Sequence, residues 1–248
     1  MCSVRTILIA CTLCLPLQVQ AQTVTSIEPS APVLPSNTLR FYITFDRPAR
    51  GLVHQGGIKL LDSNNVPVEN AFMDFGQELW SPDGKRLTVL LDPGKMKRGV
   101  EGPHSELSPL KENENYEIAF GTFQHAFRVG PAVRDKLDPA SWTIPTVEAP
   151  ARTVDIKFDR VMDAALLADQ LQVQDDEGRP VIVAVRVMAG GLGVRLRPSH
   201  PLRKGEYRIS VSPILEDVAG NRINEALDHP VNEKPTESPG LVIDFVVH

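Results

Sequence analysis

Acidic residues in the second half of the chain have the chemistry of a calcium site. Asp159 and Asp163 lie close together in the sequence, and Asp217 begins the run Asp-Val-Ala-Gly-Asn that ends at Asn221. Calcium takes six to eight oxygen ligands, often from loops that join strands. The same run is equally a turn sequence, because glycine adopts positive φ and asparagine bonds its own backbone. We favour the turn, on which Asn221→Ala would cost at most about 1 kcal/mol.

Three basic residues, Lys95, Lys97 and Arg98, lie near the start of a long segment without hydrophobic periodicity, residues 94–115. Basic side chains on a loop can hold an anionic glycan or a phosphate. Long loops on β-sandwiches often carry binding residues. We favour a solvated loop, because no aromatic residue adjoins the cluster to stack on a ligand. The cluster is still a candidate ligand-binding surface.

No motif in the sequence predicts a reaction. The metalloprotease HExxH motif, the nucleophile elbow, the glycine-rich phosphate loop and CxxC are all missing. The six histidines are dispersed, and His125 falls on an apolar strand face, which is typical of a structural histidine. A net charge of −5 provides no broad basic surface for nucleic acid. We therefore expect a non-catalytic protein with no cofactor and no nucleic-acid partner.

The elements that carry these residues are predicted to be short strands. Proline makes up 21 of the 248 residues, which disfavours long helices. Apolar and polar residues alternate in several runs; in residues 39–45, for example, Leu39, Phe41, Ile43 and Phe45 share one face and Arg40, Tyr42 and Thr44 the other. Such runs indicate half-buried antiparallel strands. One short helix of about two turns is predicted over residues 164–170.

An internal repeat sets the predicted domain count. The run FYITFDR at 41–47 matches VDIKFDR at 154–160. Four more blocks follow in the same order in both copies: 58–62 with 171–175, 87–93 with 192–198, 116–118 with 207–209, and 123–129 with 241–247. Ordered blocks of this kind predict two copies of one domain. We expect an all-β chain of two tandem immunoglobulin-like antiparallel β-sandwiches, residues 22–130 and 131–248, after an N-terminal signal peptide.

Residues 1–21 have the features of that signal peptide. Arg5 precedes a short apolar run at 6–17, and Ala21 supplies the small residue at the cleavage site. Cleavage after Ala21 would give a secreted or periplasmic protein without a transmembrane segment, because the apolar run is too short to span a bilayer. The alternative is a lipoprotein anchored at Cys11. All three cysteines lie in this segment, so the mature chain would contain no disulfide.

The second copy resembles a known family. Its runs IKFDRVMD at 156–163 and DVAGN at 217–221 are similar to the FSEPMD and DxAGN patterns of bacterial Ig-like domains of the S-layer (SbsA) type. The resemblance covers residues 150–247. The first copy departs from it, since Pro48 and Ala49 replace Met-Asp and the DxAGN run is missing. The resemblance implies a spacer, adhesion or scaffold role, although a fold alone implies no activity.

These observations together predict a non-catalytic secreted or envelope protein with a structural, adhesion or protein–protein interaction role. Its partner would be another envelope protein or a surface polymer, and exposed edge strands would make the contact. The alternative is a carbohydrate- or calcium-binding accessory module. Aromatic side chains along a concave face would favour that alternative, and Trp80 and Trp142 are the only tryptophans.

Overall fold

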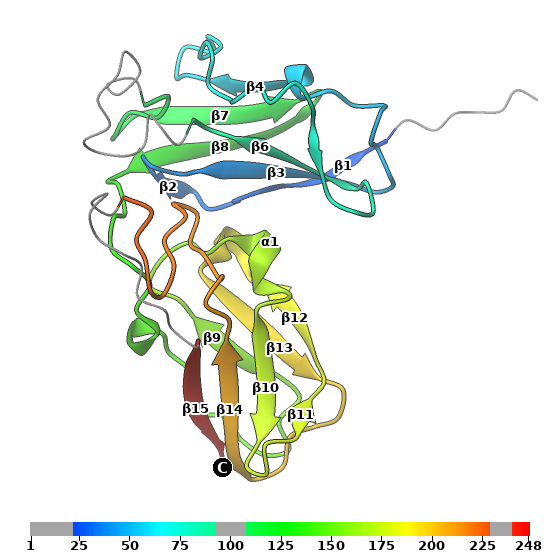
Figure 1. Ribbon diagram of the computed structural model, residues 1–248, viewed down its shortest axis with the longest axis vertical. Helices are drawn as coiled ribbons and strands as arrows, with labels where there is room; N and C mark the ends of the chain where they lie inside the picture. The colour runs from blue at the N-terminus through cyan, green and yellow to red at the C-terminus, as the bar shows by residue number, and fades with distance from the viewer. Residues whose placement is uncertain (1–21, 93–107, 229–239) are drawn as a thin grey trace, which may run out of the picture.

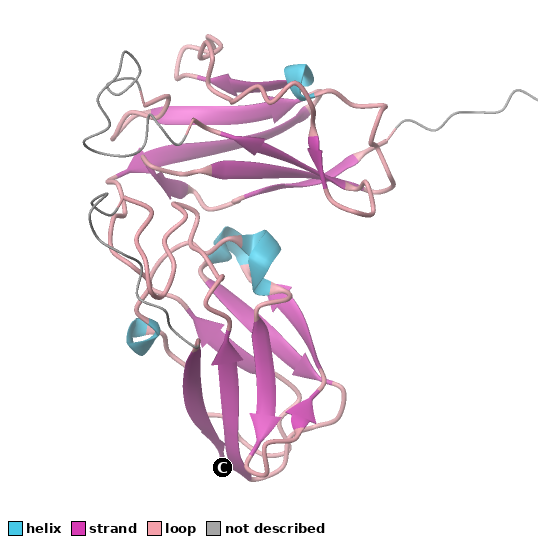
Figure 2. Ribbon diagram, viewed as in Figure 1, coloured by secondary structure: helices cyan, strands magenta, loops and turns pink. Residues whose placement is uncertain are grey.

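The computed structural model describes residues 22–92, 108–228 and 240–248. The predicted signal segment 1–21, including Cys11 and Ala21, lies outside the described residues, and so do Lys95, Lys97 and Arg98. Strands and loops make up almost all of the described chain (Figure 2). We refer to residues 22–130 as the N-terminal half and to residues 131–248 as the C-terminal half.

The N-terminal half consists of eight strands. They are β1 (Val24–Glu28), β2 (Val33–Pro35), β3 (Arg40–Phe45), β4 (Ile58–Leu61), β5 (Leu79–Trp80), β6 (Arg86–Leu90), β7 (Asn115–Phe120) and β8 (Phe123–Gly130). They form two four-stranded sheets, in the orders β1-β3-β6-β5 and β2-β8-β7-β4. All the pairings are antiparallel except that of β2 with β8, which is parallel. The chain changes sheet between β1 and β2, where Pro29 and Pro32 supply no backbone donor for a continuous ladder.

The C-terminal half repeats this plan with seven strands. They are β9 (Val154–Lys157), β10 (Leu171–Asp175), β11 (Pro180–Val181), β12 (Val183–Val187), β13 (Gly193–Pro198), β14 (Gly205–Val211) and β15 (Leu241–Val247). The sheets have the orders β12-β13-β9 and β11-β10-β14-β15, and all their pairings are antiparallel. In Figure 1 the strands of the two halves run in different directions, and the loop after β14 extends towards the N-terminal half.

The strand registers follow the internal repeat. Leu60 of β4 pairs with Ile118 of β7, and the matching residues Val173 and Ile209 pair in the C-terminal half. The last hairpins agree too, since Tyr116 pairs with Phe127 and Tyr207 with Phe245. The all-β prediction is thus confirmed.

One pairing departs from the repeat by two residues. Phe41 of β3 pairs with Val89, whereas Val154, its match in β9, pairs with Leu196 and not with Val194, the match of Val89. A shift of two residues keeps every side chain on the same face of the sheet. The alternating pattern is therefore satisfied in both halves although the register differs.

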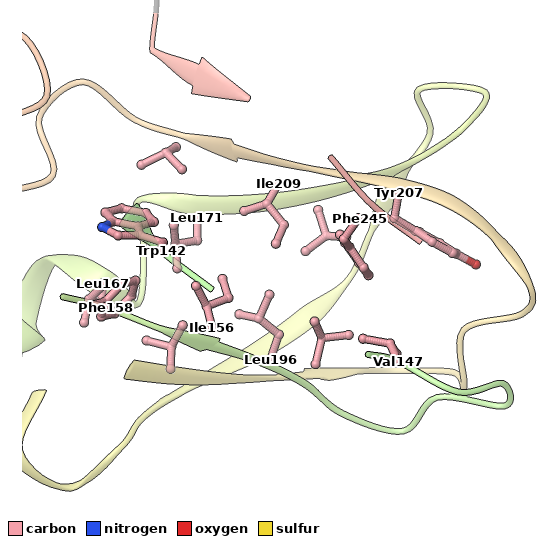
Figure 3. Packing of buried hydrophobic residues seen from close by; sticks show 14 of the residues in the cluster. Trp142, Val147, Ile156, Phe158, Leu167, Leu171, Leu196, Tyr207, Ile209 and Phe245 are labelled. Carbon is pink, nitrogen blue, oxygen red and sulfur yellow. The ribbon is translucent and has the colours of Figure 1, made fainter. Parts of the chain in front are cut away.

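Each half has its own hydrophobic core between its two sheets. In the C-terminal half, Leu171, Ile209 and Phe245 lie on one side of the core and Ile156 and Leu196 on the other (Figure 3). The N-terminal core is built in the same way around inward residues of β3, β6, β7 and β8, among them Phe41, Ile43, Leu87, Val89, Ile118 and Phe127. Burial of these side chains contributes roughly 1.5–3 kcal/mol for each large one.

Helical structure is minor. α1 (Ala164–Leu167) is a single turn, capped by Asp163, and is therefore shorter than the predicted two turns. The chain continues as a turn through Ala168, and the Leu167 side chain is buried in the core. Short 3-10 segments occur at η1 (Gln55–Gly57), η3 (Pro139–Ser141) and η4 (Ala189–Gly191). In the part of the chain that the structure describes, no helix is long and apolar enough to cross a membrane.

Candidate functional site

Asp163 connects the two halves of the chain. Its Oδ1 accepts hydrogen bonds from the backbone N–H groups of Ala165 (2.9 Å) and Leu166 (3.3 Å), the usual role of an aspartate at the start of a helix. Its Oδ2 faces the N-terminal half. There it accepts a hydrogen bond of 2.7 Å from the Tyr42 hydroxyl and lies 3.0 Å from Nε of Arg40. The carboxylate is only 1% exposed, so its donors replace water.

Glu216 is the second buried acid at this contact. One of its oxygens contacts the guanidinium of Arg40. The other accepts two hydrogen bonds from Arg222, from Nε at 2.8 Å and from Nη2 at 2.6 Å. Arg40 therefore lies between two carboxylates of the C-terminal half. Breaking one side of such a buried pair leaves an uncompensated charge, which is strongly unfavourable.

The DVAGN run forms a closed turn beside these acids. Oδ1 of Asp217 accepts hydrogen bonds of 2.9 Å from the backbone N–H groups of Ala219 and Asn221. The Asn221 side chain donates to Oδ2 of Asp217 (2.9 Å) and to the carbonyl of Val133 (3.0 Å), and it accepts from the N–H of Leu227 (3.0 Å). The turn thus organises its own loop and also holds the connecting segment near Val133.

Two features of the structure explain why the DVAGN run has a glycine at position 220. Its φ is +80°, in the left-handed region that favours glycine, and a Cβ at this position would lie 3.0 Å from Cδ2 of Leu39 and 3.2 Å from Cδ2 of Leu227. Leu39 belongs to the N-terminal half, and its backbone N–H donates to the carbonyl of Val218 (2.8 Å). Backbone conformation and close approach of the two halves both require a glycine here.

Asn37 completes the contact from the N-terminal side. Its side chain donates to the carbonyl of Val133 (2.6 Å) and accepts from the N–H of the same residue (2.9 Å). Val161 of the C-terminal half also packs against the N-terminal hydrophobic core. The buried polar and charged residues of the described chain all lie in this region; they are Asn37, Thr38, Asp163, Glu216, Asp217 and Asn221. We call these residues, together with Arg40 and Tyr42, the polar junction.

The protonation of the polar junction follows from burial. Burial raises the pKa of the Asp217 carboxyl, while hydrogen bonds from Asn221 and the charge of Arg160 oppose this rise. Burial, with the neighbouring Asp163 carboxylate, also raises the pKa of Tyr42 well above its ordinary value. Tyr42 therefore stays protonated and remains a hydrogen-bond donor across the physiological pH range.

The predicted calcium residues do not all come together. Asp217 and Asn221 are in contact, but Asp159 is 30% exposed on its side chain and forms an ion pair with Arg160 at 3.2 Å. Arg160 also lies 3.5 Å from Asp217. Within residues 22–92, 108–228 and 240–248, no group of three or more His, Cys, Asp or Glu side chains is placed to hold a metal ion. The turn stays the favoured interpretation of these residues, and calcium binding stays the alternative.

Sequence reasoning missed the N-terminal side of the polar junction. The alternating pattern places Arg40 and Tyr42 on the polar face of their strand, opposite the core, and this placement is correct. Tyr42 is nevertheless buried, because the C-terminal half covers that face. A tyrosine beside an arginine on a polar face, in a chain with a partly apolar DVAGN turn, is the signal that could have indicated the contact.

The two tryptophans pack within the halves. Trp142 is 7% exposed and lies edge-on against Phe158, with ring centroids 4.7 Å apart. Trp80 packs against Phe45, with ring centroids 5.9 Å apart.

A cavity of about 380 Å³ lies beside the polar junction, but aliphatic residues such as Val33, Val161 and Leu192 line most of it.

No protein-family model matches the chain, and no curated protein matches it. Solved structures are similar only distantly. The pullulanase SAP of Group B Streptococcus is 11% identical with a TM-score of 0.25, covering 77% of this chain and 22% of its own. Domains 5–6 of the S-layer protein SbsC are 11% identical with a TM-score of 0.25, covering 92% of this chain and 97% of their own. Tandem Ig repeats of Dlar are 10% identical with a TM-score of 0.23, covering 75% and 88%.

The chain therefore spans less than a quarter of the pullulanase to which it is similar. It also spans 31% of the longer SbsC structure that contains domains 4–9. With TM-scores of 0.25 or less, these similarities carry no argument about this chain. Its own sheets and cores have the immunoglobulin-like β-sandwich class that the alternating strands predicted.

Proposed function

We propose that this chain is a non-catalytic structural protein of the secreted or envelope class. It acts as a spacer or adhesion module in which two Ig-like domains, residues 22–130 and 131–248, are held in one fixed arrangement. The single observation that supports this proposal most is the polar junction. Ion pairs and hydrogen bonds between buried and partly buried side chains join segments that are more than a hundred residues apart in the sequence.

The polar junction favours a fixed arrangement because its bonds are directional. Arg40 contacts Asp163 and Glu216 at the same time, and Tyr42 donates to Asp163. A rotation of one half against the other would break these bonds and leave buried charges unpaired, which costs several kcal/mol. Interfaces between domains otherwise permit relative motion. A fixed orientation suits a protein that transmits force or sets a distance between two attachment points.

A non-catalytic role is consistent with how the buried acids are used. Asp163, Glu216 and Asp217 each accept hydrogen bonds from protein donors, and all three are buried. In a catalytic site such a group would need to reach a substrate.

The envelope location rests on the N-terminal segment, residues 1–21. We propose cleavage after Ala21, with a lipid anchor at Cys11 as the alternative. The family of bacterial Ig-like domains of the S-layer type is the one that the motifs at 156–163 and 217–221 favour. Intact mass measurement of the protein recovered from an envelope fraction tests the location. A mature N-terminus at Gln22 supports a cleaved signal peptide, and a lipid on Cys11 supports the anchored form.

Small-angle X-ray scattering tests the fixed arrangement. We expect the unmodified chain to scatter as one rigid particle that matches the structure. The double variant Arg40→Gln/Tyr42→Phe should scatter as a wider ensemble, because both side chains that reach Asp163 from the N-terminal half are changed. The near-ultraviolet circular dichroism of the buried Trp142 should stay the same in the variant, since that residue packs against Phe158 inside the C-terminal half.

The matched control is Arg179→Gln/Tyr116→Phe. It makes the same two changes outside the polar junction, where Arg179 forms an exposed ion pair with Asp175 and Tyr116 contacts Glu114. The control should scatter like the unmodified chain. A flexible unmodified chain, or equal loosening in both double variants, would refute the proposed fixed arrangement.

A further inference from the structure

The outer face of the sheet β12-β13-β9 is strongly basic. Side chains alternate along these strands, and Val154, Ile156, Val194 and Leu196 point inward to the core. The outward positions on the three strands are occupied by Ala184, Arg186, Arg195, Arg197, Asp155 and Lys157. Four of these six residues are basic, and all four are exposed. We call Arg186, Arg195, Arg197 and Lys157 the arginine face (its strands are labelled in Figure 1).

Only one acid lies on this sheet face, and it is already bound. Asp155 forms a two-pronged ion pair with Arg195, with Oδ1 2.7 Å from Nε and Oδ2 2.7 Å from Nη2. The charge of Lys157 also acts on Asp155. The side chains of Arg186 and Arg197 form no hydrogen bond or ion pair with any part of the chain that the structure describes. Their guanidinium groups are available to a partner.

This arrangement is unfavourable for the isolated sheet. Arg186 and Arg195 are direct cross-strand neighbours, and like charges in that position destabilise a sheet. The chain as a whole carries a net charge of −5, so the concentration of positive charge does not follow from its composition. Asp155 compensates the charge of Arg195 and leaves Arg186 without a carboxylate on this sheet face, which points to a binding role.

We infer that the arginine face binds an acidic polysaccharide, an extended glycan with carboxylate or sulfate groups along its length. Arginine binds such groups with two parallel hydrogen bonds. Arg195 and Arg197 are two residues apart on one strand, a spacing of about 7 Å, and Arg186 projects from the next strand, about 4.8 Å away. A paired sheet holds these groups in a fixed, flat array, which suits a repeating anionic chain.

The composition of the sheet face favours a glycan over two other anionic partners. Single-stranded nucleic acid is bound through aromatic side chains on which bases stack, and none of the six outward residues is aromatic. Attachment to a bilayer surface uses large apolar side chains, and Ala184 is the only apolar residue among the six. The inference deepens the proposed function, because it names a surface polymer as the partner of a structural or adhesion module.

The test measures binding of the full chain to polygalacturonate by isothermal titration calorimetry at low and high salt. Uncharged dextran, single-stranded DNA and phosphatidylglycerol vesicles are measured alongside. We expect binding to polygalacturonate that weakens with salt, because the charges are exposed. The triple variant Arg186→Gln/Arg197→Gln/Lys157→Gln should bind about tenfold more weakly, as expected for the loss of three exposed ion pairs.

The matched control is Lys59→Gln/Lys111→Gln/Lys136→Gln, which removes the same charge from exposed positions elsewhere. It should bind like the unmodified chain. The melting temperature of the arginine-face variant should be unchanged or higher, because the repulsion between Arg186 and Arg195 is removed.

Absence of binding, an equal loss in the two triple variants, or equally strong binding of DNA or vesicles would overturn the inference. The scattering experiment on the unmodified chain is independent of these results. A negative binding result would therefore leave the proposed fixed arrangement intact. A flexible chain in the scattering experiment would likewise leave the binding of the arginine face to a glycan intact.

Discussion

The hydroxyl of Tyr42 donates a hydrogen bond of 2.7 Å to the carboxylate of Asp163, although the two residues are 121 positions apart in the sequence. The other oxygen of the same carboxylate caps α1. One side chain thus fixes a local turn in the C-terminal half and receives a donor from the N-terminal half. A substitution at Tyr42 should therefore destabilise the contact between the two halves as well as its own strand.

Tyr42→Phe should lower the free energy of unfolding by about 2 kcal/mol, because it removes a buried hydrogen bond to a charged acceptor. Urea unfolding followed by tryptophan fluorescence measures the change. The control is Tyr116→Phe, in the same half, where the hydroxyl lies 3.2 Å from Glu114 and is only partly buried. We expect the control to cost about 1 kcal/mol or less. An equal loss in the free energy of unfolding for the two variants would mean that the Tyr42 hydrogen bond stabilises the fold no more than the Tyr116 hydrogen bond does.

Gly220→Ala should destabilise the protein more than Gly178→Ala. The two glycines have nearly the same backbone conformation, with φ of +80° and +77°. A Cβ at position 178 would meet no atom within 4 Å, whereas at position 220 it would lie 3.0 Å from Leu39. We expect about 1 kcal/mol for Gly178→Ala, from backbone strain, and about 2 kcal/mol for Gly220→Ala.

Urea unfolding of the two glycine variants gives this comparison directly. The difference between them isolates the close approach of the two halves at Leu39. A Gly220→Ala variant no less stable than Gly178→Ala would show that this approach relaxes without cost.

The ion pair of Asp155 should make the free energy of unfolding depend on pH. Hydrogen bonds from Arg195 lower the pKa of the Asp155 carboxyl. A folded-state pKa below the unfolded value, about 3.9, means that the ion pair stabilises the fold above that pH. Its contribution is lost as the pH falls through the lower, folded-state pKa. Because Arg195 is 52% exposed, we expect a contribution of at most about 1 kcal/mol.

Unfolding of the unmodified chain and Asp155→Asn between pH 7 and pH 2 checks this expectation. The variant should be less stable at neutral pH, and the two proteins should converge as the solution becomes strongly acidic. A difference that grows with acidity would contradict the assigned sign. Added salt should reduce the difference at neutral pH, since the pair is exposed.

Much of the sheet structure could be predicted because alternation and repetition are local properties of a sequence. Matching positions such as Leu60 and Val173 have matching partners in the two halves. The two-residue difference in register between β3-β6 and β9-β13 could not be predicted, because it changes no side chain's face. A hydrophobic pattern predicts which face of a strand is buried. It does not distinguish between pairings that differ by two residues, because both pairings bury the same side chains.

The polar junction could be predicted only in part. The turn at 217–221 follows from its residues, since the Asp217 carboxylate accepts hydrogen bonds from the backbone N–H groups of Ala219 and Asn221. The role of Arg40 could not be predicted, because a polar strand face has the same pattern whether solvent or another part of the chain covers it. Burial of Tyr42 depends on how the two halves pack against each other, and the alternation of apolar and polar residues along a strand does not predict that packing.

The last prediction concerns calcium. The oxygens of Asp163, Asp217 and Asn221 already accept hydrogen bonds from backbone N–H groups of the same chain. A calcium ion would have to displace these donors. It would also have to approach Arg160, which lies 3.2 Å from Asp159 and 3.5 Å from Asp217. We therefore expect millimolar calcium to leave the melting temperature within about 1 °C of its value with a chelator. Binding at 100 times the dissociation constant would stabilise the fold by about 2.7 kcal/mol, a shift of several degrees.

Asn221→Ala distinguishes a local turn from a wider structural role for the same residue. A residue that only forms a turn would cost at most about 1 kcal/mol when changed to alanine. Asn221 is 1% exposed, and its side chain also donates to Val133 and accepts from Leu227. Its loss leaves buried partners unsatisfied, so we expect a cost of about 2–3 kcal/mol, which is more than a turn alone explains and equal with and without calcium. A rise in melting temperature of more than about 3 °C with calcium, abolished by Asp217→Ala, would instead establish a calcium site in this loop.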